Sequence, residues 1–242
     1  GDFQPSRQPA FEKDADFEDT ALAFFDADGD GDPDLAVGSG GNHRPTGSRL
    51  LNARLYLNDG KGLFVRNDQA LPTTGFNAAV VVPLDFDADG DLDLFVGSRS
   101  VPGQYGVPPR HFLLQNDGSG NFKNVAKQAA PDFARLGMVT AAKWVNITGD
   151  ERPELVVVGE WAGPQIFEIQ ANKLTLSRSP ELTALKGWWY AVESEDLDGD
   201  GDQDLILGNR GENFYFTGTK EQPAKLWVSD FDDNGTIEQI LT

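Results

Sequence analysis

The 242-residue sequence contains no cysteine, only two histidines and only one methionine. Without cysteine the chain can form no disulfide framework, zinc finger or thiol nucleophile. No run of about 18 apolar residues occurs, so we expect no membrane-inserted segment. Positive charge is also scarce, with 20 lysines and arginines against 39 acidic residues. The absence of a basic stripe argues against nucleic acid as a partner.

Much of the negative charge is gathered in five segments of nine residues. The first reads Asp26-Ala-Asp-Gly-Asp-Gly-Asp-Pro-Asp34, and related segments begin at Asp85, Asn146, Asp196 and Asp230. Together the five segments hold 22 of the 39 acidic residues. Carboxylates at such density are not buried without counter-ions. The pattern therefore predicts bound cations rather than a generally acidic surface.

The alternation of oxygen-bearing residues in these segments is typical of a calcium loop. Positions 1, 3, 5 and 9 offer side-chain oxygens, position 7 offers a backbone carbonyl, and glycine at position 6 permits a sharp turn. Many oxygen ligands on a flexible loop favour calcium over magnesium, which keeps more of its water. The ligands predicted in four of the segments, with position 7 acting through its carbonyl, are Asp26, Asp28, Asp30, Asp32, Asp34, Asp85, Asp87, Asp89, Asp91, Asp93, Asp196, Asp198, Asp200, Asp202, Asp204, Asp230, Asp232, Asn234, Thr236 and Glu238.

The third segment departs from the pattern. It places Asn146, Thr148, Asp150 and Glu154 at the side-chain positions and Arg152 at the carbonyl position, and it lacks the glycine at position 6. Two interpretations stay open for it, a weak calcium site and a turn without metal.

An EF-hand is the first alternative for these loops. It requires a bidentate glutamate at position 12 and a helix on each side. Here the residue at position 12 is aliphatic in every segment, and the flanks have the pattern of strands. The five residues at position 12 are Val37, Val96, Val157, Leu207 and Leu241. The sequence therefore excludes an EF-hand.

The acidic segments belong to a longer repeat that predicts four strands. A short apolar run precedes each segment, and an aliphatic run such as Leu35-Ala-Val-Gly38 follows most of them. Residues 54–64 and 111–122 then place Asp-Gly between alternating apolar runs, which indicates a hairpin. Such units in tandem are typical of propeller blades. The predicted fold class is all-β, a β-propeller of four-stranded antiparallel blades with calcium loops between strands one and two.

In its order of loop, strand and hairpin, the chain resembles the FG-GAP/VCBS repeats, the blades of integrin-α-like β-propellers. Within that family it is similar to the bacterial cell-surface proteins that often carry an ASPIC/UnbV module. The resemblance implies calcium stabilisation, an adhesive or ligand-binding role, and an extracellular, cell-surface or periplasmic location. It also implies a ring of about seven blades.

We expect a lead-in followed by a single propeller domain at residues 18–242. The fourth repeat leaves room for one outer strand, at 213–217, and the fifth ends after one strand. About four to five blades are therefore predicted, as part of a longer protein. The predicted divisions are a lead-in at 1–17, repeats at about 18–72, 73–133, 134–185 and 186–220, and a partial repeat at 221–242.

The long connections between strands two and three are the predicted ligand-binding surface. They lie at the end of each blade opposite the calcium loops, and their length favours a function. The candidate ligand-binding residues are His43, Arg44, Arg49, Arg99, Tyr105, Arg110, Trp161 and Arg210. The predicted function is a calcium-stabilised, cell-surface or secreted module that binds a protein or glycan ligand.

Two other functions stay open. Neither His43 nor His111 has a nucleophile–base motif beside it, so we do not expect an enzyme. The enzymatic alternative is a carbohydrate-active lyase or hydrolase with its site at the channel mouth. Convergence of His43, Arg99, Tyr105 and Arg210 in one pocket would favour it. The other alternative is a purely structural spacer.

Overall fold

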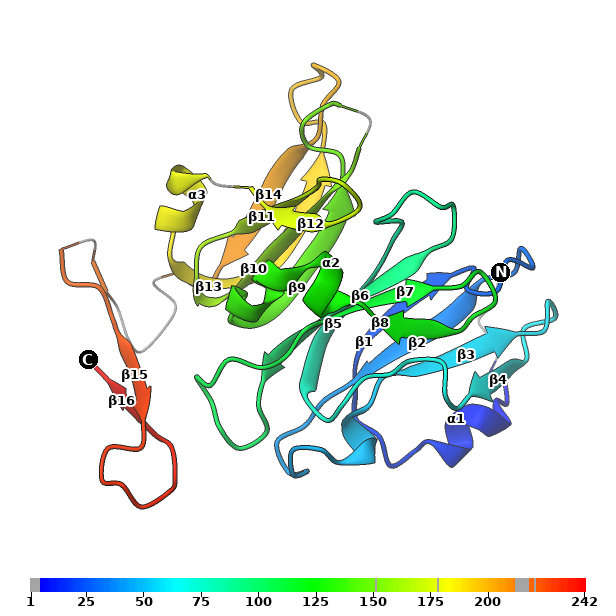
Figure 1. The fold of residues 1–242 in the computed structure, drawn as a ribbon, viewed down its shortest axis with the longest axis horizontal. Helices are drawn as coiled ribbons and strands as arrows, with labels where there is room; N and C mark the ends of the chain where they lie inside the picture. Colours follow the sequence, from blue (N-terminus) through cyan, green and yellow to red (C-terminus); the bar gives the residue numbers. More distant parts are fainter. Residues whose placement is uncertain (1–4, 151, 178, 212–217, 220) are drawn as a thin grey trace.

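The computed structural model describes residues 5–150, 152–177, 179–211, 218–219 and 221–242, which form a series of antiparallel sheets (Figure 1). In this described part of the chain, no helix is long and apolar enough to cross a membrane.

The first two repeats each form a four-stranded antiparallel sheet in chain order. The first sheet contains β1 (Asp19–Phe25), β2 (Asp34–Ser39), β3 (Arg54–Asn58) and β4 (Phe64–Asn67). The second contains β5 (Asn77–Leu84), β6 (Asp93–Ser100), β7 (Phe112–Asn116) and β8 (Phe122–Asn124). In both sheets the acidic loop joins the first two strands, and an Asp-Gly turn joins the last two.

The third repeat has the same four strands, and the strands that follow it are paired as hairpins. The third sheet contains β9 (Met138–Val145), β10 (Glu154–Ala162), β11 (Gln165–Ile169) and β12 (Leu174–Leu176). The hairpins are β13 (Gly187–Glu195) with β14 (Asp204–Asn209), and β15 (Leu226–Ser229) with β16 (Glu238–Leu241). β13 also pairs with the end of β10, at Glu160 with Trp188 and at Ala162 with Gly187.

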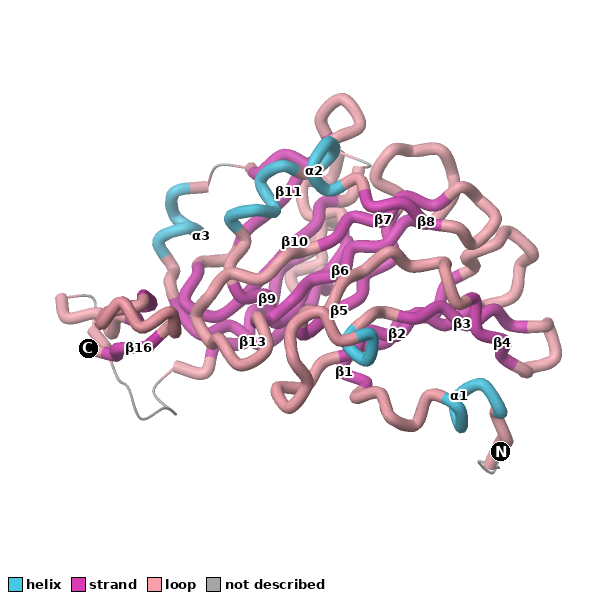
Figure 2. The backbone as a smooth tube through the Cα atoms, turned by 60° about the horizontal axis from the view of Figure 1, so that its bottom comes forward, coloured by secondary structure: helices cyan, strands magenta, loops and turns pink. Residues whose placement is uncertain are grey.

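The sheets pack on one another through their first strands. β1 contacts β5, β5 contacts β9, and β9 contacts β13, so the sheets follow one another across the molecule (Figure 2). Each interface has its own apolar core. The residue two places after the last acidic position lies in the core shared with the following sheet, where Ala36, Phe95 and Val156 are all 0% exposed. The equivalent residue of β14, Ile206, is 49% exposed.

Short helices add to the all-β fold without changing its class. They are α1 (Pro9–Lys13), α2 (Ala126–Ala129), α3 (Pro180–Ala184) and the 3₁₀ turns at Arg49–Leu51 and Pro131–Arg135. No helix was predicted at these places, while the all-β class is confirmed. Helices of one turn are too short to show a hydrophobic period, which is why the sequence pattern did not reveal them.

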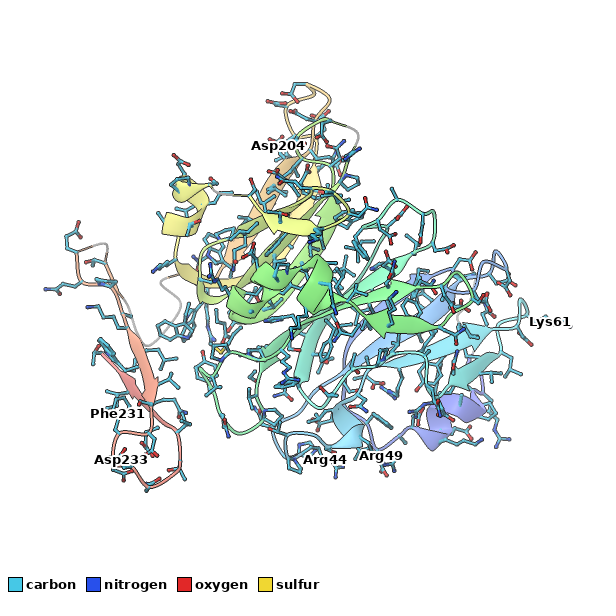
Figure 3. All side chains as sticks on the ribbon, in the orientation of Figure 1. Arg44, Arg49, Lys61, Asp204, Phe231 and Asp233 are labelled. Atoms are coloured by element: carbon cyan, nitrogen blue, oxygen red, sulfur yellow. The ribbon has the colours of Figure 1, made fainter. Side chains whose placement is uncertain are left out.

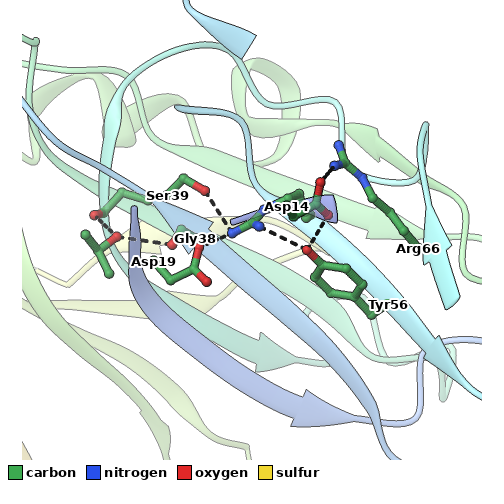
Figure 4. Close-up of polar contacts among 9 residues, drawn as sticks. Asp14, Asp19, Gly38, Ser39, Tyr56 and Arg66 are labelled. Carbon is green, nitrogen blue, oxygen red and sulfur yellow. Dashed lines mark hydrogen bonds and ion pairs between the residues drawn. The ribbon is translucent and has the colours of Figure 1, made fainter. Parts of the chain in front are cut away.

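A buried polar network holds the residues before β1 against the first sheet (Figure 4). Arg54 is 3% exposed and donates to Asp19 and to the hydroxyl of Tyr56, the latter at 2.9 Å. Tyr56 in turn donates to Asp14 at 2.6 Å, and the guanidinium of Arg54 lies 4.0 Å from the ring centre of Phe17. Burial is the main reason that the pKa of Tyr56 is raised, so its hydroxyl stays a donor.

The structure confirms the predicted four-stranded antiparallel units, with acidic loops between their first two strands. The strand predicted at 213–217 lies outside the described residues. The closed propeller ring stays a prediction, because the described sheets follow one another without returning to the first.

Candidate functional site

Four of the five acidic loops bring three carboxylates together. In each of them, oxygen atoms from positions 1, 3 and 9 all lie within 4.8 Å of one another. Convergent oxygens from one short loop are what a hard cation such as calcium requires. The four clusters are Asp26 with Asp28 and Asp34, Asp85 with Asp87 and Asp93, Asp196 with Asp198 and Asp204, and Asp230 with Asp232 and Glu238.

Backbone amides of the loop hold the carboxylate at position 1. The amides of Gly29 and Gly31 donate to the two oxygens of Asp26 at 2.8 and 2.9 Å, and the fourth loop repeats both bonds. This wrapping requires a left-handed backbone at position 6, which glycine adopts without strain. The four glycines at this position have φ between +85° and +102°; they are Gly31, Gly90, Gly201 and Gly235.

The carboxylate at position 9 fastens the loop to the third strand of its sheet. Asp34 accepts from the amides of Ala27 and Asn58, both at 2.8 Å, and Asp93 accepts the matching pair in the second loop. Both carboxylates are 0% exposed. A cation bound here would therefore connect the first, second and third strands of the sheet.

Without a cation, ionisation of several of these carboxyl groups is unfavourable. Burial first, and repulsion from neighbouring aspartates second, raise the pKa values of Asp28 and Asp87. Burial raises the pKa of Asp93 to about 7, although the amide of Asn116 works against the shift. One buried oxygen of Asp85 and one of Asp87 have no hydrogen-bond partner. Buried polar atoms normally have a hydrogen-bond partner or a bound ion, so these two oxygens fit the ligands of a cation.

Position 5 has a different part in the loop. Its side chain lies outside the three-carboxylate cluster and accepts the amide of position 7 at 2.8–3.2 Å in all four loops. The residues concerned are Asp30, Asp89, Asp200 and Asn234. Their role as ligands, and that of the position-7 carbonyls, stays a prediction.

Among the described residues, the third loop forms no such cluster. Glu154 instead accepts the amide of Ile147 at 2.9 Å and the hydroxyl of Thr148 at 2.8 Å. Thr148 thus stands where the four clusters have their second carboxylate, so the third loop offers one negative ligand fewer at this position. This arrangement favours the turn without metal over the weak calcium site.

Position 4 was missed by the sequence reasoning. All five loops have positive φ there, including the non-glycine residues Ala88 at 59° and Asp233 at 57°. Three loops have glycine at this position, which was the available signal. We expect Ala88→Gly to raise the free energy of unfolding by about 0.5–1 kcal/mol, since it relieves left-handed strain. Urea unfolding in calcium measures this, with Ala142→Gly, at a regularly paired position of β9, as the destabilising control.

Three candidate ligand-binding residues meet at a buried carboxylate that the sequence did not single out. Arg99 donates to Oε1 of Glu160 through Nε at 3.1 Å and Nη2 at 2.7 Å. Tyr105 donates to Oε2 at 2.8 Å, and Tyr190 also donates to Oε1. The indole of Trp161 donates to the hydroxyl of Tyr105 at 3.0 Å. We call these five residues the Glu160 cluster.

The charges of the Glu160 cluster support one another. Burial, the largest single influence, lowers the pKa of Arg99, but the charge and hydrogen bonds of Glu160 together with the two nearby tyrosines outweigh it, and the pKa is raised. Burial raises the pKa values of Tyr105 and Tyr190, and their bonds to Glu160 add to the shift. Both hydroxyls therefore remain donors to the 2% exposed Glu160.

Aromatic rings extend the cluster toward β13 and β14. Trp161 has φ of +63°, a rare conformation for a bulky residue, and its ring contacts Trp188 edge to face at 4.9 Å. Arg210 lies over the ring of Trp188 at 5.8 Å. Backbone strain of this kind is characteristic of functional sites.

The other candidate ligand-binding residues lie elsewhere. His43 lies 3.2 Å from Glu18, next to the first sheet. Arg44 and Arg49 lie at the end of the first sheet, far from Asp204 (Figure 3), and Arg110 is exposed before β7. The pocket of His43, Arg99, Tyr105 and Arg210 that would favour an enzyme is therefore not formed as a single set.

Tandem four-stranded antiparallel units, each with an acidic loop after its first strand, define an acidic-loop β-repeat protein. Residues 26–96 and 146–207 match the FG-GAP-like repeat family. The chain belongs to this family.

Two curated proteins show distant similarity to part of the chain. It is 29% identical over 159 residues to human phosphatidylinositol-glycan-specific phospholipase D, and 31% identical to the bovine protein of that name. Each match covers 59% of this chain and 18% of the relative. The matched region is thus about a fifth of either relative.

Proposed function

We propose that the four three-carboxylate loops bind calcium and stabilise a propeller-type fold. The observation that carries this is the second loop, where Asp85 and Asp87 keep unsatisfied buried oxygens beside the fully buried Asp93. A site of about 10⁻⁴–10⁻³ M affinity at millimolar calcium contributes about 0.4–1.4 kcal/mol. The ions hold the scaffold, because each lies in a loop joining two strands of one sheet.

Calcium affinity at the second loop is expected to fall in acid. The pKa of Asp93 is raised to about 7 without metal, so a proton competes with the ion below that pH. For the same reason the metal-free fold loses stability as pH rises toward 7, since the folded state holds the proton more tightly than the unfolded state does. Calorimetric titration should show about a tenfold loss of affinity per pH unit below about 7. In an Asp93→Asn variant this pH-dependent component of binding should disappear together with the second site, and an equal component in both proteins would contradict the assignment.

We further propose that the Glu160 cluster and the adjoining Trp188 and Arg210 form a glycan-binding surface. Aromatic rings offer faces on which sugars stack, and guanidinium groups donate paired hydrogen bonds to hydroxyl or carboxylate oxygens. Arg99 is 48% exposed and Tyr190 is 38% exposed, so both can reach a ligand. A protein ligand is the second possibility for the same surface.

A binding role is preferred to catalysis. Glu160 is the buried carboxylate of the cluster, and its two oxygens already accept from Arg99, Tyr105 and Tyr190. Such a carboxylate is suited to positioning side chains rather than to exchanging protons with a substrate. Together with a calcium-dependent scaffold, this supports an extracellular, cell-surface or periplasmic setting, where calcium is abundant.

A glycan array tests the binding role. In millimolar calcium we expect binding that Trp188→Ala and Arg210→Ala weaken about tenfold or more, the loss expected from about 1–3 kcal/mol. Val65→Ala, at a 59% exposed position on β4, is the matched control and should bind as the parent does. Glycan binding unchanged by both variants would contradict this surface. Binding to proteins but to no glycan would instead support a protein ligand for this surface.

A further inference from the structure

One asparagine connects the first two acidic loops. Asn116 is the last residue of β7 in the second sheet and is 6% exposed. Its backbone amide donates to Oδ1 of Asp93, the position-9 carboxylate of the second loop, at 2.8 Å. Its side-chain amide donates to the carbonyl of Ala27, at position 2 of the first loop, also at 2.8 Å. The same residue therefore holds parts of both loops.

Ala27 extends this connection to the first carboxylate cluster. It is 1% exposed, and its amide donates to Oδ2 of Asp34 at 2.8 Å. A continuous path of hydrogen bonds thus runs from Asp34 through Ala27 and Asn116 to Asp93. Buried hydrogen bonds are costly to leave unmade, so the groups along this path are held in one arrangement. The path joins the position-9 carboxylates of two three-carboxylate clusters.

The β7–β8 turn lies against the first loop beside this path. A methyl group on Gly120 of the turn would lie 3.5 Å from Cβ of Asp28. A methyl group on Gly29 of the loop would lie 3.5 Å from the carbonyl oxygen of Gly118. Because the two segments lie so close, a change in the shape of the first loop would also disturb the turn that follows Asn116.

The equivalent residues of the first and third sheets differ from Asn116. Asn58 ends β3, and its backbone amide bonds to Asp34 as that of Asn116 bonds to the second loop. Its side-chain amide donates to the carbonyl of Pro33 in its own loop at 3.1 Å. In the third sheet Ile169 ends β11, and isoleucine has no side-chain donor. Asn58 therefore offers a matched control for Asn116.

We propose that Asn116 couples the first two acidic loops, so that calcium in either loop strengthens binding in the other. This inference rests on the calcium role proposed above. Repulsion among the carboxylates loosens a loop that holds no ion. An ion in the first loop orders Ala27, which holds Asn116 and thereby its backbone amide against Asp93. The second loop is then already ordered when its ion arrives, which gives positive cooperativity. The coupling changes affinity and leaves the number of ions bound at saturating calcium unchanged.

Calorimetric titration of full-length variants with calcium measures the coupling. In the reference protein, Asp198→Asn and Asp232→Asn disable the fourth and fifth loops, and adding Asp28→Asn or Asp87→Asn leaves a single loop. The two-ion binding constant of the reference protein should exceed the product of the two single-loop constants about fivefold. A ratio of about one would overturn the coupling and leave calcium binding itself supported. Absence of binding in every protein would overturn the calcium role as well.

Substitution of Asn116 tests whether its side chain carries the coupling. In the reference protein and its two single-loop derivatives, Asn116→Ala should bring the ratio to about one, since the bond to Ala27 is lost. Asn58→Ala loses a bond within one loop and weakens that loop, but it should leave the ratio at about fivefold. A ratio that persists in the Asn116 variant would overturn the role of this residue.

Exchange of the Asn116 side-chain amide, followed by NMR, gives a readout that does not depend on the folding of Asn116→Ala. In calcium this amide should exchange slowly, because it is buried and donates to the carbonyls of Ala27 and Leu92. Asp28→Asn should speed its exchange about fivefold, in proportion to the coupling. Asp198→Asn disables the fourth loop in the same way and should leave the exchange rate unchanged. An exchange rate that Asp28→Asn does not alter would overturn the proposal.

Discussion

Removal of calcium is expected to lower the melting temperature of this chain by about 3–22 °C. Four loops at about 0.4–1.4 kcal/mol each contribute a few kcal/mol together, and in a domain of this size 1 kcal/mol corresponds to about 2–4 °C. The loss of stability should be greatest in the first two sheets, because Asp34 and Asp93 each tie their loop to the third strand of the sheet. Scanning calorimetry with calcium and with excess chelator measures the shift.

The control for this experiment is magnesium. Excess magnesium should restore little of the melting temperature, since it binds fewer protein oxygens and retains its water. A melting temperature unaffected by the chelator would contradict a stabilising role for the loops.

Loss of the carboxylate at Glu160 is the largest effect expected from a single substitution. Glu160→Ala should lower the free energy of unfolding by about 1.5–3 kcal/mol, because it removes a buried carboxylate that accepts charge-assisted hydrogen bonds, while the half-exposed guanidinium of Arg99 can turn to water. Tyr105 and Tyr190 lose their acceptor at the same time. The carboxylate joins β10, β13 and the end of β6, so the third sheet and both of its neighbours are affected.

The matched control is Glu193→Ala. Glu193 also pairs with a cation, Lys143, but it is 72% exposed, so its removal should cost less than about 1 kcal/mol. Urea unfolding of the two variants in calcium gives the comparison. Equal costs would show that Glu160 is no more than a surface partner of Arg99.

The acidic loops were predictable from the sequence because all their essential parts are local. Nine consecutive residues supply the carboxylates and the left-handed glycine, as the amide bonds from Gly29 and Gly31 to Asp26 illustrate. The strands followed from short apolar runs between turn residues, such as the run after Asp93 that forms β6. Local spacing was enough in both cases.

The Glu160 cluster was not predictable in full, because its members come from separate sheets. Arg99 and Trp161 stand two residues after the glycine of their second strands, which gave them as candidates. Glu160 and Tyr190 carry no such mark, and only the packing of β13 on β10 brings Tyr190 to the carboxylate. Glu160 precedes Trp161 directly, and a charged residue after the apolar run that follows Glu154 was the available signal.

The third loop shows where a repeat pattern alone misleads. Its spacing retains Asn146, Asp150 and Glu154, yet Thr148 at position 3 donates its hydroxyl to Glu154. A hydroxyl in place of a carboxylate removes one negative ligand and satisfies another, so the turn is stable without an ion. A threonine at position 3 of another acidic loop would be expected to abolish calcium binding by that loop.

The number of calcium ions bound per chain tests the central claim most directly. Equilibrium dialysis or calorimetric titration of the whole chain should give four ions, and Asp93→Asn should give three while leaving the other loops filled. A chain that binds no calcium at millimolar concentration, or an Asp93→Asn variant that still binds four, would contradict the account.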